Sequence, residues 1–350
     1  MKLLKGVGDF FALDIGTGAL RMVELKGDEK RGWVLERVAY EGIDKLLTQD
    51  VSDEGRAKLT KTVAEVAKKA GIKTKNVAVG LPAGKTYAAV VEINTVPPKE
   101  IKNTVSYQLD QFVPMAIDEA KVDYVVLGES PANKEKTEIL IASTAKVYAE
   151  QMLGDFEGAG LNVVAFEPAP IAVARALTPI GATDAWLIID CGELATDLVI
   201  VYKGFPRLVR SVMGGLDTLV KATATGLAMQ DAEARQYLLK FGALADQNDG
   251  QVLRAIDTAL SDFAGELMKS INFFRSKYTD VKLGGVVLTG FVAVVPGVPE
   301  YLQAKMGMSV VRGNPWQAVK LTPEQQQKIA PVASEFAVAV GIAERSNRNV

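Results

Sequence analysis

Two segments of this 350-residue chain share one plan, and this repetition constrains the fold more than any other feature. Residues 11–25 read FALDIGTGALRMVEL, and residues 186–201 read WLIIDCGELATDLVIV. Each has an apolar run, an aspartate two residues before a glycine, a short turn, and a stretch in which apolar and polar residues alternate. Alternation with a period of two indicates a β-strand, and glycine permits a tight backbone turn. Each segment is therefore predicted to be a β-hairpin.

The turn of such a hairpin suits a phosphate group. Backbone N–H groups of a glycine-containing turn can point at an anion, and an aspartate at the strand end can hold Mg²⁺ directly or through its waters. One hairpin alone, with Asp14 and Gly16 or with Asp190 and Gly192, is explained equally well by turn conformation. Two copies, one opening each half of the chain, favour a two-lobed α/β protein with its ligand between the lobes.

The side-chain inventory excludes several kinds of chemistry. The chain has no histidine and a single cysteine, Cys191, so an intramolecular disulfide, a cysteine-cluster metal site and histidine-dependent catalysis are excluded. A formal net charge of −2 gives no general reason to expect nucleic-acid or anionic-membrane binding. No apolar run approaches the roughly 18 residues of a membrane span, and the first apolar stretch is too short for a secretory signal. We therefore expect a cytoplasmic protein.

The order of the expected elements divides the chain into two lobes and an inserted block. Helices are expected at residues 52–70, 100–112, 146–158, 216–227, 299–305 and 332–345, and helices also fill most of 231–278. Strands are expected between them, notably at 33–40, 77–81, 87–93, 122–127, 138–144, 161–166, 207–212 and 285–288. The predicted parts are a first lobe (1–86 with 164–185), an inserted domain (87–163), a second lobe (186–335), and a C-terminal helix returning toward the first lobe with a polar tail (336–350). The alternative is that 87–163 simply continues the first lobe.

Longer segments carry a resemblance to one family. They are VGLPAG at 79–84, the run from 91 to 128, AGLNVVAFEPAPIAVARAL at 159–177, INFFRS at 271–276 and GVVLTGFVAVVPGVPEYL at 285–302. Together with the hairpins, they resemble the PilM family of type IV pilus assembly proteins in the actin-like ATPase superfamily, with FtsA as a more distant relative. The resemblance covers nearly the whole chain. The run from 91 to 128 is its most specific part, because the hairpins are shared across the superfamily.

This resemblance implies a two-lobed actin-like (ribonuclease-H-like) α/β fold with a small inserted α+β domain, and ATP with Mg²⁺ in the cleft. Asp14 and Asp190 match the metal-associated acids, and Glu167 is similar to a carboxylate that lies near the attacking water in related chaperone ATPases. A carboxylate at a helix start is the plain alternative for Glu167. The residues that match nucleotide contacts are Gly16, Thr17, Gly18, Gly192, Thr196, Gly214, Gly215, Glu266, Lys269 and Gly290.

Two of these matches also have conformational explanations. Gly214 and Gly215 before a predicted helix suit an anion or a sugar, and they suit a tight turn equally well. Glu266 and Lys269, three residues apart on a helix, are also a routine surface pair.

The sequence departs from the family pattern at both loops. Glu193 and Leu194 stand where many relatives have a glycine-rich run, and Phe291 and Val292 follow Gly290 where relatives place further glycines. Bulk and negative charge near the phosphates weaken the backbone contribution to stabilising a transition state. We therefore expect ATP binding with weak or absent hydrolysis.

The function that the resemblance implies is a nucleotide-binding adaptor of the type IV pilus assembly machinery. Its inserted domain would bind the N-terminal cytoplasmic tail of the inner-membrane protein PilN, which would recruit it to the inner face of the cytoplasmic membrane. Two alternatives stay open: an FtsA-like polymerising cytoskeletal protein, and a small-molecule kinase on the same fold. FtsA-like proteins carry a C-terminal amphipathic membrane helix that the final residues ERSNRNV do not provide, and a kinase needs a positioned carboxylate base.

Overall fold

The computed structural model describes residues 9–28 and 31–345. In these residues the first lobe is built on a six-stranded sheet with the order β14-β3-β2-β1-β4-β8. Strand β1 pairs antiparallel with β2 and parallel with β4, and β3 is antiparallel to β2. The strands are β1 (Phe11–Ile15), β2 (Ala19–Asp28), β3 (Gly32–Gly42), β4 (Asn76–Leu81), β8 (Asn162–Pro168) and β14 (Val319–Lys320).

The second lobe repeats this topology in a five-stranded sheet, β11-β10-β9-β12-β13. Strand β9 pairs antiparallel with β10 and parallel with β12, and β11 is antiparallel to β10. The strands are β9 (Ala185–Cys191), β10 (Ala195–Tyr202), β11 (Phe205–Met213), β12 (Leu283–Gly290) and β13 (Val310–Arg312). The repetition seen in the sequence therefore extends from the hairpins to five strands of each sheet, and β14 is the additional strand of the first.

Both predicted hairpins are confirmed, and their turns are equivalent. The Gly16 amide donates to the Ala19 carbonyl at 3.0 Å, and the Gly192 amide donates to the Ala195 carbonyl at 2.9 Å. In each copy the turn follows the aspartate strand directly, so Asp14 and Asp190 lie at equivalent sheet positions.

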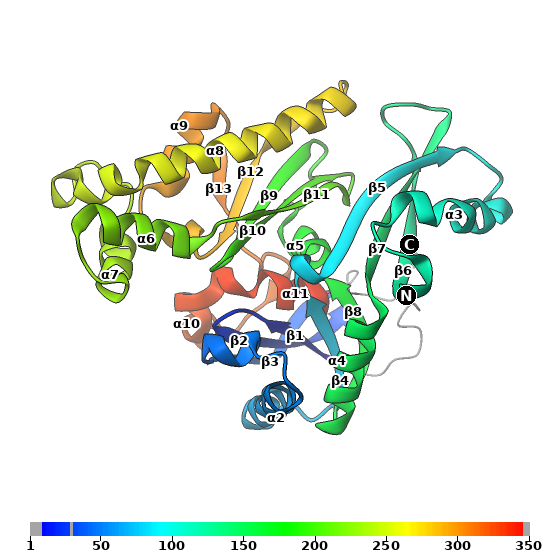
Figure 1. Cartoon of the computed structure of the whole chain (residues 1–350), viewed down its shortest axis with the longest axis horizontal. Helices are drawn as coiled ribbons and strands as arrows, with labels where there is room; N and C mark the ends of the chain where they lie inside the picture. Colours follow the sequence, from blue (N-terminus) through cyan, green and yellow to red (C-terminus); the bar gives the residue numbers. More distant parts are fainter. Residues whose placement is uncertain (1–8, 29–30, 346–350) are drawn as a thin grey trace.

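Two apolar helices, α5 (Ala169–Leu177) and α11 (Ala337–Ala343), pack between the sheets (Figure 1). Every described residue of α11 is buried, and the core around these helices includes Ala12 and Ala78 of the first sheet and Ile188 and Val199 of the second. This shared core places the two hairpin turns on facing sides of one cleft.

Amphipathic helices cover the outer faces of both sheets. Helix α2 (Asp53–Lys69) is capped by Ser52, whose hydroxyl accepts from the Gly55 amide at 3.1 Å, and it buries Val63 and Val66. In helix α8 the buried residues recur every three or four positions, which gives one continuous apolar face. The helices of the second lobe are α6 (Leu216–Leu227), α7 (Asp231–Phe241), α8 (Gln251–Lys277) and α9 (Val298–Met306).

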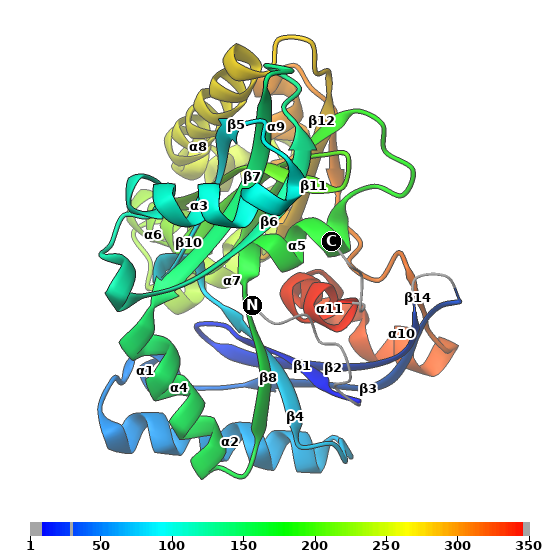
Figure 2. The same ribbon diagram turned by 90° about the vertical axis from the view of Figure 1, so that its right-hand side faces the viewer.

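The inserted domain has a sheet of its own, with the order β5-β7-β6, and one covering helix, α3. Figure 2 shows this sheet and helix side by side in front of the second lobe. Ile93, Val105 and Ile141 form part of its separate core. The elements are β5 (Thr86–Asn94), α3 (Pro98–Phe112), β6 (Ala120–Glu129) and β7 (Lys136–Ala145).

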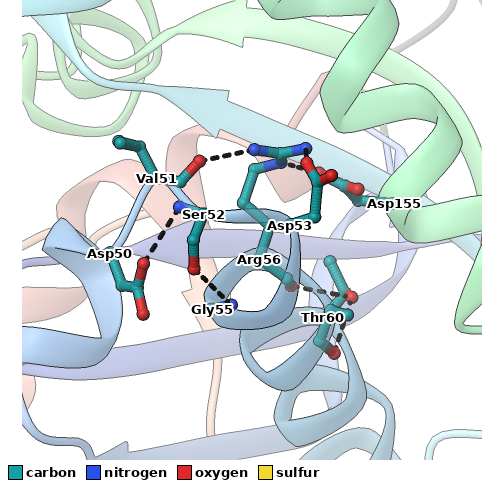
Figure 3. A network of polar contacts seen from close by, with 9 residues as sticks. Asp50, Val51, Ser52, Asp53, Gly55, Arg56, Thr60 and Asp155 are labelled. Carbon is teal, nitrogen blue, oxygen red and sulfur yellow. Dashed lines mark hydrogen bonds and ion pairs between the residues drawn. The ribbon is translucent and has the colours of Figure 1, made fainter.

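The boundary of this domain differs from the predicted 87–163. Helix α4 (Lys146–Gly158) packs on α2 and buries Phe156 in the core of the first lobe, and β8 pairs with β4. The Arg56 guanidinium on α2 bonds Asp155 on α4 at 2.8 Å and also bonds Asp53 and the Val51 carbonyl (Figure 3). Residues 146–163 therefore belong to the first lobe, and the separate sheet occupies 86–145.

Other differences lie in short elements. The predicted helix at 332–345 is divided into a 3₁₀ segment, Ala330–Phe336, and helix α11. Helices α1 (Lys45–Gln49) and α10 (Pro323–Ile329) were not predicted. Because β14 joins the first sheet, the chain returns to the first lobe before residue 336. Within the described part of the chain, every helix is too short or too polar to cross a membrane.

Candidate functional site

A cavity of about 230 Å³ lies where the two hairpin turns face each other. The first turn contributes Asp14, Gly16, Thr17 and Gly18, and its counterpart contributes Asp190 and Gly192. Gly290, at the end of β12, lines the same cavity, as does Phe291. Seven of the residues predicted to contact the nucleotide or the metal therefore line one cavity.

A larger neighbouring cavity, of about 640 Å³, lies in the second lobe between the end of β11 and helices α6 and α8. Its lining includes the other five predicted nucleotide contacts, Thr196, Gly214, Gly215, Glu266 and Lys269, together with Val292. Cys191 lines both cavities. The burial of Cys191 raises the pKa of its thiol to about 12, so this residue contributes packing and not a nucleophile.

The Gly-Gly turn is built against the second hairpin turn. Gly215 precedes α6, and a Cβ atom at this position would lie 2.3 Å from the Gly192 carbonyl oxygen, so a larger residue would push the two loops apart. The Leu216 amide donates to that same carbonyl at 3.0 Å. Thr196 is buried, and its hydroxyl donates to the Gly214 carbonyl at 2.8 Å. Thr196 therefore braces the turn between the two cavities.

Asp14 lies beside a positive charge. Its cross-strand partner is Arg21, which donates to the Asp14 carboxylate at 3.1 Å and also bonds Glu335. Burial raises the pKa of Asp14, and the nearby Arg21 guanidinium opposes that shift. The carboxylate of the first hairpin is therefore already compensated by the protein.

Asp190 lies beside a negative charge. Its cross-strand partner is Asp197, which also lines the cavity. Burial, with the added repulsion of Asp197 and Asp14, raises the pKa of Asp190 to about 7, and burial raises the pKa of Asp197 to about 6. The Arg21 guanidinium offsets only part of this rise for Asp190, and carboxylate oxygens of this kind are ligands that suit Mg²⁺.

The residues present fit a Mg²⁺ ion that keeps other ligands. Among the described residues, no cluster of three or more acidic, cysteine or histidine side chains could enclose a metal. Because Mg²⁺ usually binds one or two carboxylates and completes its octahedron with water and phosphate oxygens, Asp190 and Asp197 are an adequate protein contribution.

Glu266 and Lys269 form a charged edge of the larger cavity. Lys269 donates to Glu266 at 2.6 Å, and Arg210 of β11 donates to the other carboxylate oxygen at 2.9 Å. The bond from Lys269 lowers the pKa of Glu266, so this carboxylate is ionised at neutral pH. An ionised carboxylate is an acceptor that can bind two hydroxyl groups.

Glu167 lies next to a lining residue of the smaller cavity, because its strand partner is Gly80. It is absent from the described lining of both cavities, and its buried carboxylate is held by Arg175 at 2.5 and 3.2 Å. Arg345 lies 3.7 Å from the same carboxylate. These contacts tie β8 to α5 and to Arg345.

Sequence reasoning missed Arg21, Asp197 and Glu335, which all line the smaller cavity. Arg21 and Asp197 each stand seven residues after the aspartate of their hairpin. Aligning the two copies would have identified both. Glu335 lies 314 residues from Arg21, and no local pattern marks it.

Comparisons with known proteins agree with the duplicated architecture. The family described as type IV pilus assembly protein PilM matches residues 12–347. A cell division protein FtsA from Enterococcus hirae is 21% identical over 343 residues, covering 87% of this chain and 77% of its own length.

Solved structures show the same fold. A PilM–PilN type IV pilus biogenesis complex contains a chain with a TM-score of 0.79 and 22% identity, covering 97% of this chain and 98% of that one. MreB5 of Spiroplasma citri bound to ADP has a TM-score of 0.56 and 12% identity, covering 96% of this chain and 95% of that one. The chain has the expected actin-like fold, and it belongs to the PilM family of type IV pilus assembly proteins.

Proposed function

We propose that this chain is a nucleotide-binding adaptor of the type IV pilus assembly machinery. It binds ATP with Mg²⁺ between its lobes and holds the N-terminal cytoplasmic tail of PilN. The observation that carries the nucleotide part is the meeting of both hairpin turns in one cavity, with Cys191 shared between it and the larger neighbour. The structure of MreB5, which has the same fold, contains bound ADP, and this supports a nucleotide site in this chain.

The phosphates of the nucleotide would lie in the smaller cavity, and its sugar and base would lie in the larger one. The backbone of the turns at 16–18 and at Gly192 would bind the phosphates, and the Asp190–Asp197 pair would hold the Mg²⁺ ion. When bound, the ion neutralises phosphate charge and orients the phosphate chain. The sugar and base would occupy the larger cavity, with Glu266 accepting from ribose hydroxyls and Gly214–Gly215 allowing close backbone approach.

Calorimetry tests the nucleotide site. Wild type should bind ATP more tightly with Mg²⁺ than without it, and Asp190→Ala should lose this dependence because a metal-facing charge is removed. Asp184→Ala is the matched control, since Asp184 pairs with Lys282 next to the opposite end of β9. Equal Mg-ATP affinity in folded wild type and Asp190→Ala would contradict the assignment.

The partner part of the proposal is supported by the family and by the inserted sheet. The structure with a TM-score of 0.79 is a PilM–PilN complex, and in this chain the sheet at 86–145 has β5 and β6 as its edges. An extended peptide can add to a sheet edge through main-chain hydrogen bonds, while pockets select alternate side chains. We propose that the PilN tail binds between this domain and the flanking lobe, which would recruit the protein to the inner face of the cytoplasmic membrane.

Hydrogen exchange with a synthetic PilN tail tests this placement. Because a disordered tail pays an ordering cost, the affinity should be moderate, on the order of micromolar. Amides of β5, β6 and the adjoining lobe should gain protection, whereas a scrambled peptide should protect none. Protection confined to α6, α7 and α9 would move the partner site, and no binding would contradict the adaptor function. Filaments that sediment with ATP would instead favour an FtsA-like role.

A further inference from the structure

The carboxylate of Glu193 joins the two sides of the cleft. Glu193 lies in the second hairpin turn, lines the smaller cavity and is 7% exposed. One of its oxygens, Oε1, accepts from the Lys45 ammonium at 2.8 Å and also from the Arg235 guanidinium. The sequence alone indicated a negative charge crowding the phosphates, whereas the structure shows a carboxylate shared by two cations.

These cations come from opposite lobes. Lys45 begins α1, and α1 is tied to the first hairpin turn, because Thr48 donates to the Thr17 carbonyl at 2.9 Å and the Ile43 amide donates to the Gly18 carbonyl at 3.0 Å. Arg235 lies on α7 of the second lobe, which packs against α6.

The backbone of Glu193 is fixed as well. The Asp217 amide at the start of α6 donates to the Glu193 carbonyl at 3.0 Å. We call the contacts of Glu193 with Lys45 and Arg235 the Glu193 bridge. This bridge connects the two hairpin turns with helices α6 and α7.

The Glu193 bridge matters because the smaller cavity has more negative than positive side chains. The described residues that line the cavity include five carboxylates, on Asp14, Asp190, Glu193, Asp197 and Glu335, and one cationic side chain, Arg21. Arg21 is already bonded to Asp14 and Glu335. A polyphosphate entering such a cavity meets strong like-charge repulsion unless further positive charge reaches it. A bound Mg²⁺ would supply part of that charge, and Lys45 and Arg235 are the cations bonded to the Glu193 carboxylate in this wall.

We propose that Lys45 and Arg235 bind the terminal phosphate of a nucleoside triphosphate, and that the Glu193 carboxylate holds these two cations until the phosphate displaces it. This inference rests on the proposed nucleotide function and adds a specificity to it. A triphosphate competes with Glu193 for both cations, whereas a diphosphate is one phosphoryl group shorter. The site therefore selects ATP over ADP, and the exchange breaks a link between the lobes when ATP binds.

Calorimetry with Mg-ATP and Mg-ADP on four full-length variants tests the proposal. Lys45→Gln and Arg235→Gln should each weaken ATP binding by about tenfold and change ADP binding by less than about twofold, because each removes one charge facing only the terminal phosphate. Glu193→Gln should tighten ATP binding by about tenfold, because the competing carboxylate charge is gone. Asp184→Asn, which removes one carboxylate from an exposed pair in the second lobe, should leave both affinities unchanged.

The outcomes separate this inference from the proposed function. An unchanged ratio of ATP to ADP affinity in Lys45→Gln and Arg235→Gln, while wild type binds Mg-ATP, overturns the inference alone. Weaker ATP binding by Glu193→Gln overturns the competition between carboxylate and phosphate. Absence of Mg-ATP binding by both wild type and Glu193→Gln overturns the nucleotide function and this inference with it. Lys45 and Arg235 are 47% and 33% exposed, so their variants are expected to fold.

Discussion

The two hairpins hold their aspartates in opposite electrostatic settings, although their backbones are equivalent. One residue per copy makes the difference: Arg21 lies opposite Asp14, and Asp197 lies opposite Asp190. A buried carboxylate beside a guanidinium is satisfied within the protein, whereas two facing carboxylates need a proton or a metal ion. The second hairpin is therefore the half of the site at which we propose that Mg²⁺ binds.

Glu167 gives a prediction about stability in place of catalysis. Its carboxylate is 3% exposed and forms a bidentate pair with Arg175. Glu167→Gln should cost about 1.5–3 kcal/mol of unfolding free energy, because the half-buried Arg175 guanidinium loses its charged bidentate partner. The folded Glu167→Gln variant should bind Mg-ATP with the affinity of wild type. Wild type itself should hydrolyse ATP slowly. Denaturant unfolding and calorimetry measure both, and a variant of wild-type stability that loses ATP turnover would restore Glu167 as a catalytic residue.

Glu344 gives a prediction about pH. Burial raises the pKa of its carboxyl from 4.5 to about 7, and Arg175 opposes the shift only in part. Because the folded protein prefers the protonated form, this group lowers stability as pH rises from about 4.5 to about 7. Glu344→Gln should therefore flatten the fall in melting temperature between pH 5 and pH 8. An identical pH profile in wild type and variant would show that Glu344 does not titrate in this window.

At the scale of elements, length decided what could be predicted. Helices α2, α4 and α6 were placed almost residue for residue, because each is a continuous helix of at least 12 residues whose pattern is local in the sequence. Strands β13 and β14 have three and two residues and show no periodicity, so only their sheet partners define them. Helix α1, five residues long, was missed for the same reason.

The contact between α5 and α11 gives a prediction about packing. A Cβ atom on Gly341 would lie 1.9 Å from the Ala172 carbonyl oxygen, so the two central helices touch through backbone. Gly341→Ala should cost about 1–3 kcal/mol through overpacking. Gly154→Ala is the matched control, because Gly154 lies inside α4 with open space around it and alanine there should gain about 0.5–1 kcal/mol. Equal effects of both substitutions on the free energy of unfolding would contradict this packing argument.

At the scale of the whole molecule, the duplicated hairpins and the family resemblance predicted the two-lobed fold, but not the contacts that join distant parts. Lys45 and Glu193 are 148 residues apart, and Glu138 and Tyr278 are 140 apart. A pair of charges at such separation has no local signature, because its energy depends on how two elements pack. For this reason the limits of the inserted domain were predicted inexactly. The contacts that attach it to the second lobe were not predicted.

That attachment is a buried polar joint between the inserted sheet and the second lobe. Glu138 of β7 is fully buried and lies 3.2 Å from the Arg207 guanidinium of β11. It also accepts from the Tyr278 hydroxyl, next to the end of α8, at 2.6 Å. Burial lowers the pKa of Arg207, and the charge of Glu138 opposes that shift, so each side chain depends on the other. Strand β5 also lies against β11.

Removing one partner of this joint should therefore cost far more than removing an exposed pair. Glu138→Ala is expected to lose about 3–5 kcal/mol of unfolding free energy, because Arg207 stays buried without a counter-charge. Glu150→Ala, in the exposed pair with Lys121, should lose less than about 1 kcal/mol. Replacing Glu138 and Arg207 together by Leu and Met should recover much of the loss, since no lone charge remains. Denaturant unfolding gives the three values, and hydrogen exchange should show β5 and β7 opening first in Glu138→Ala. Similar losses in Glu138→Ala and Glu150→Ala would mean that apolar packing alone holds the inserted domain in place.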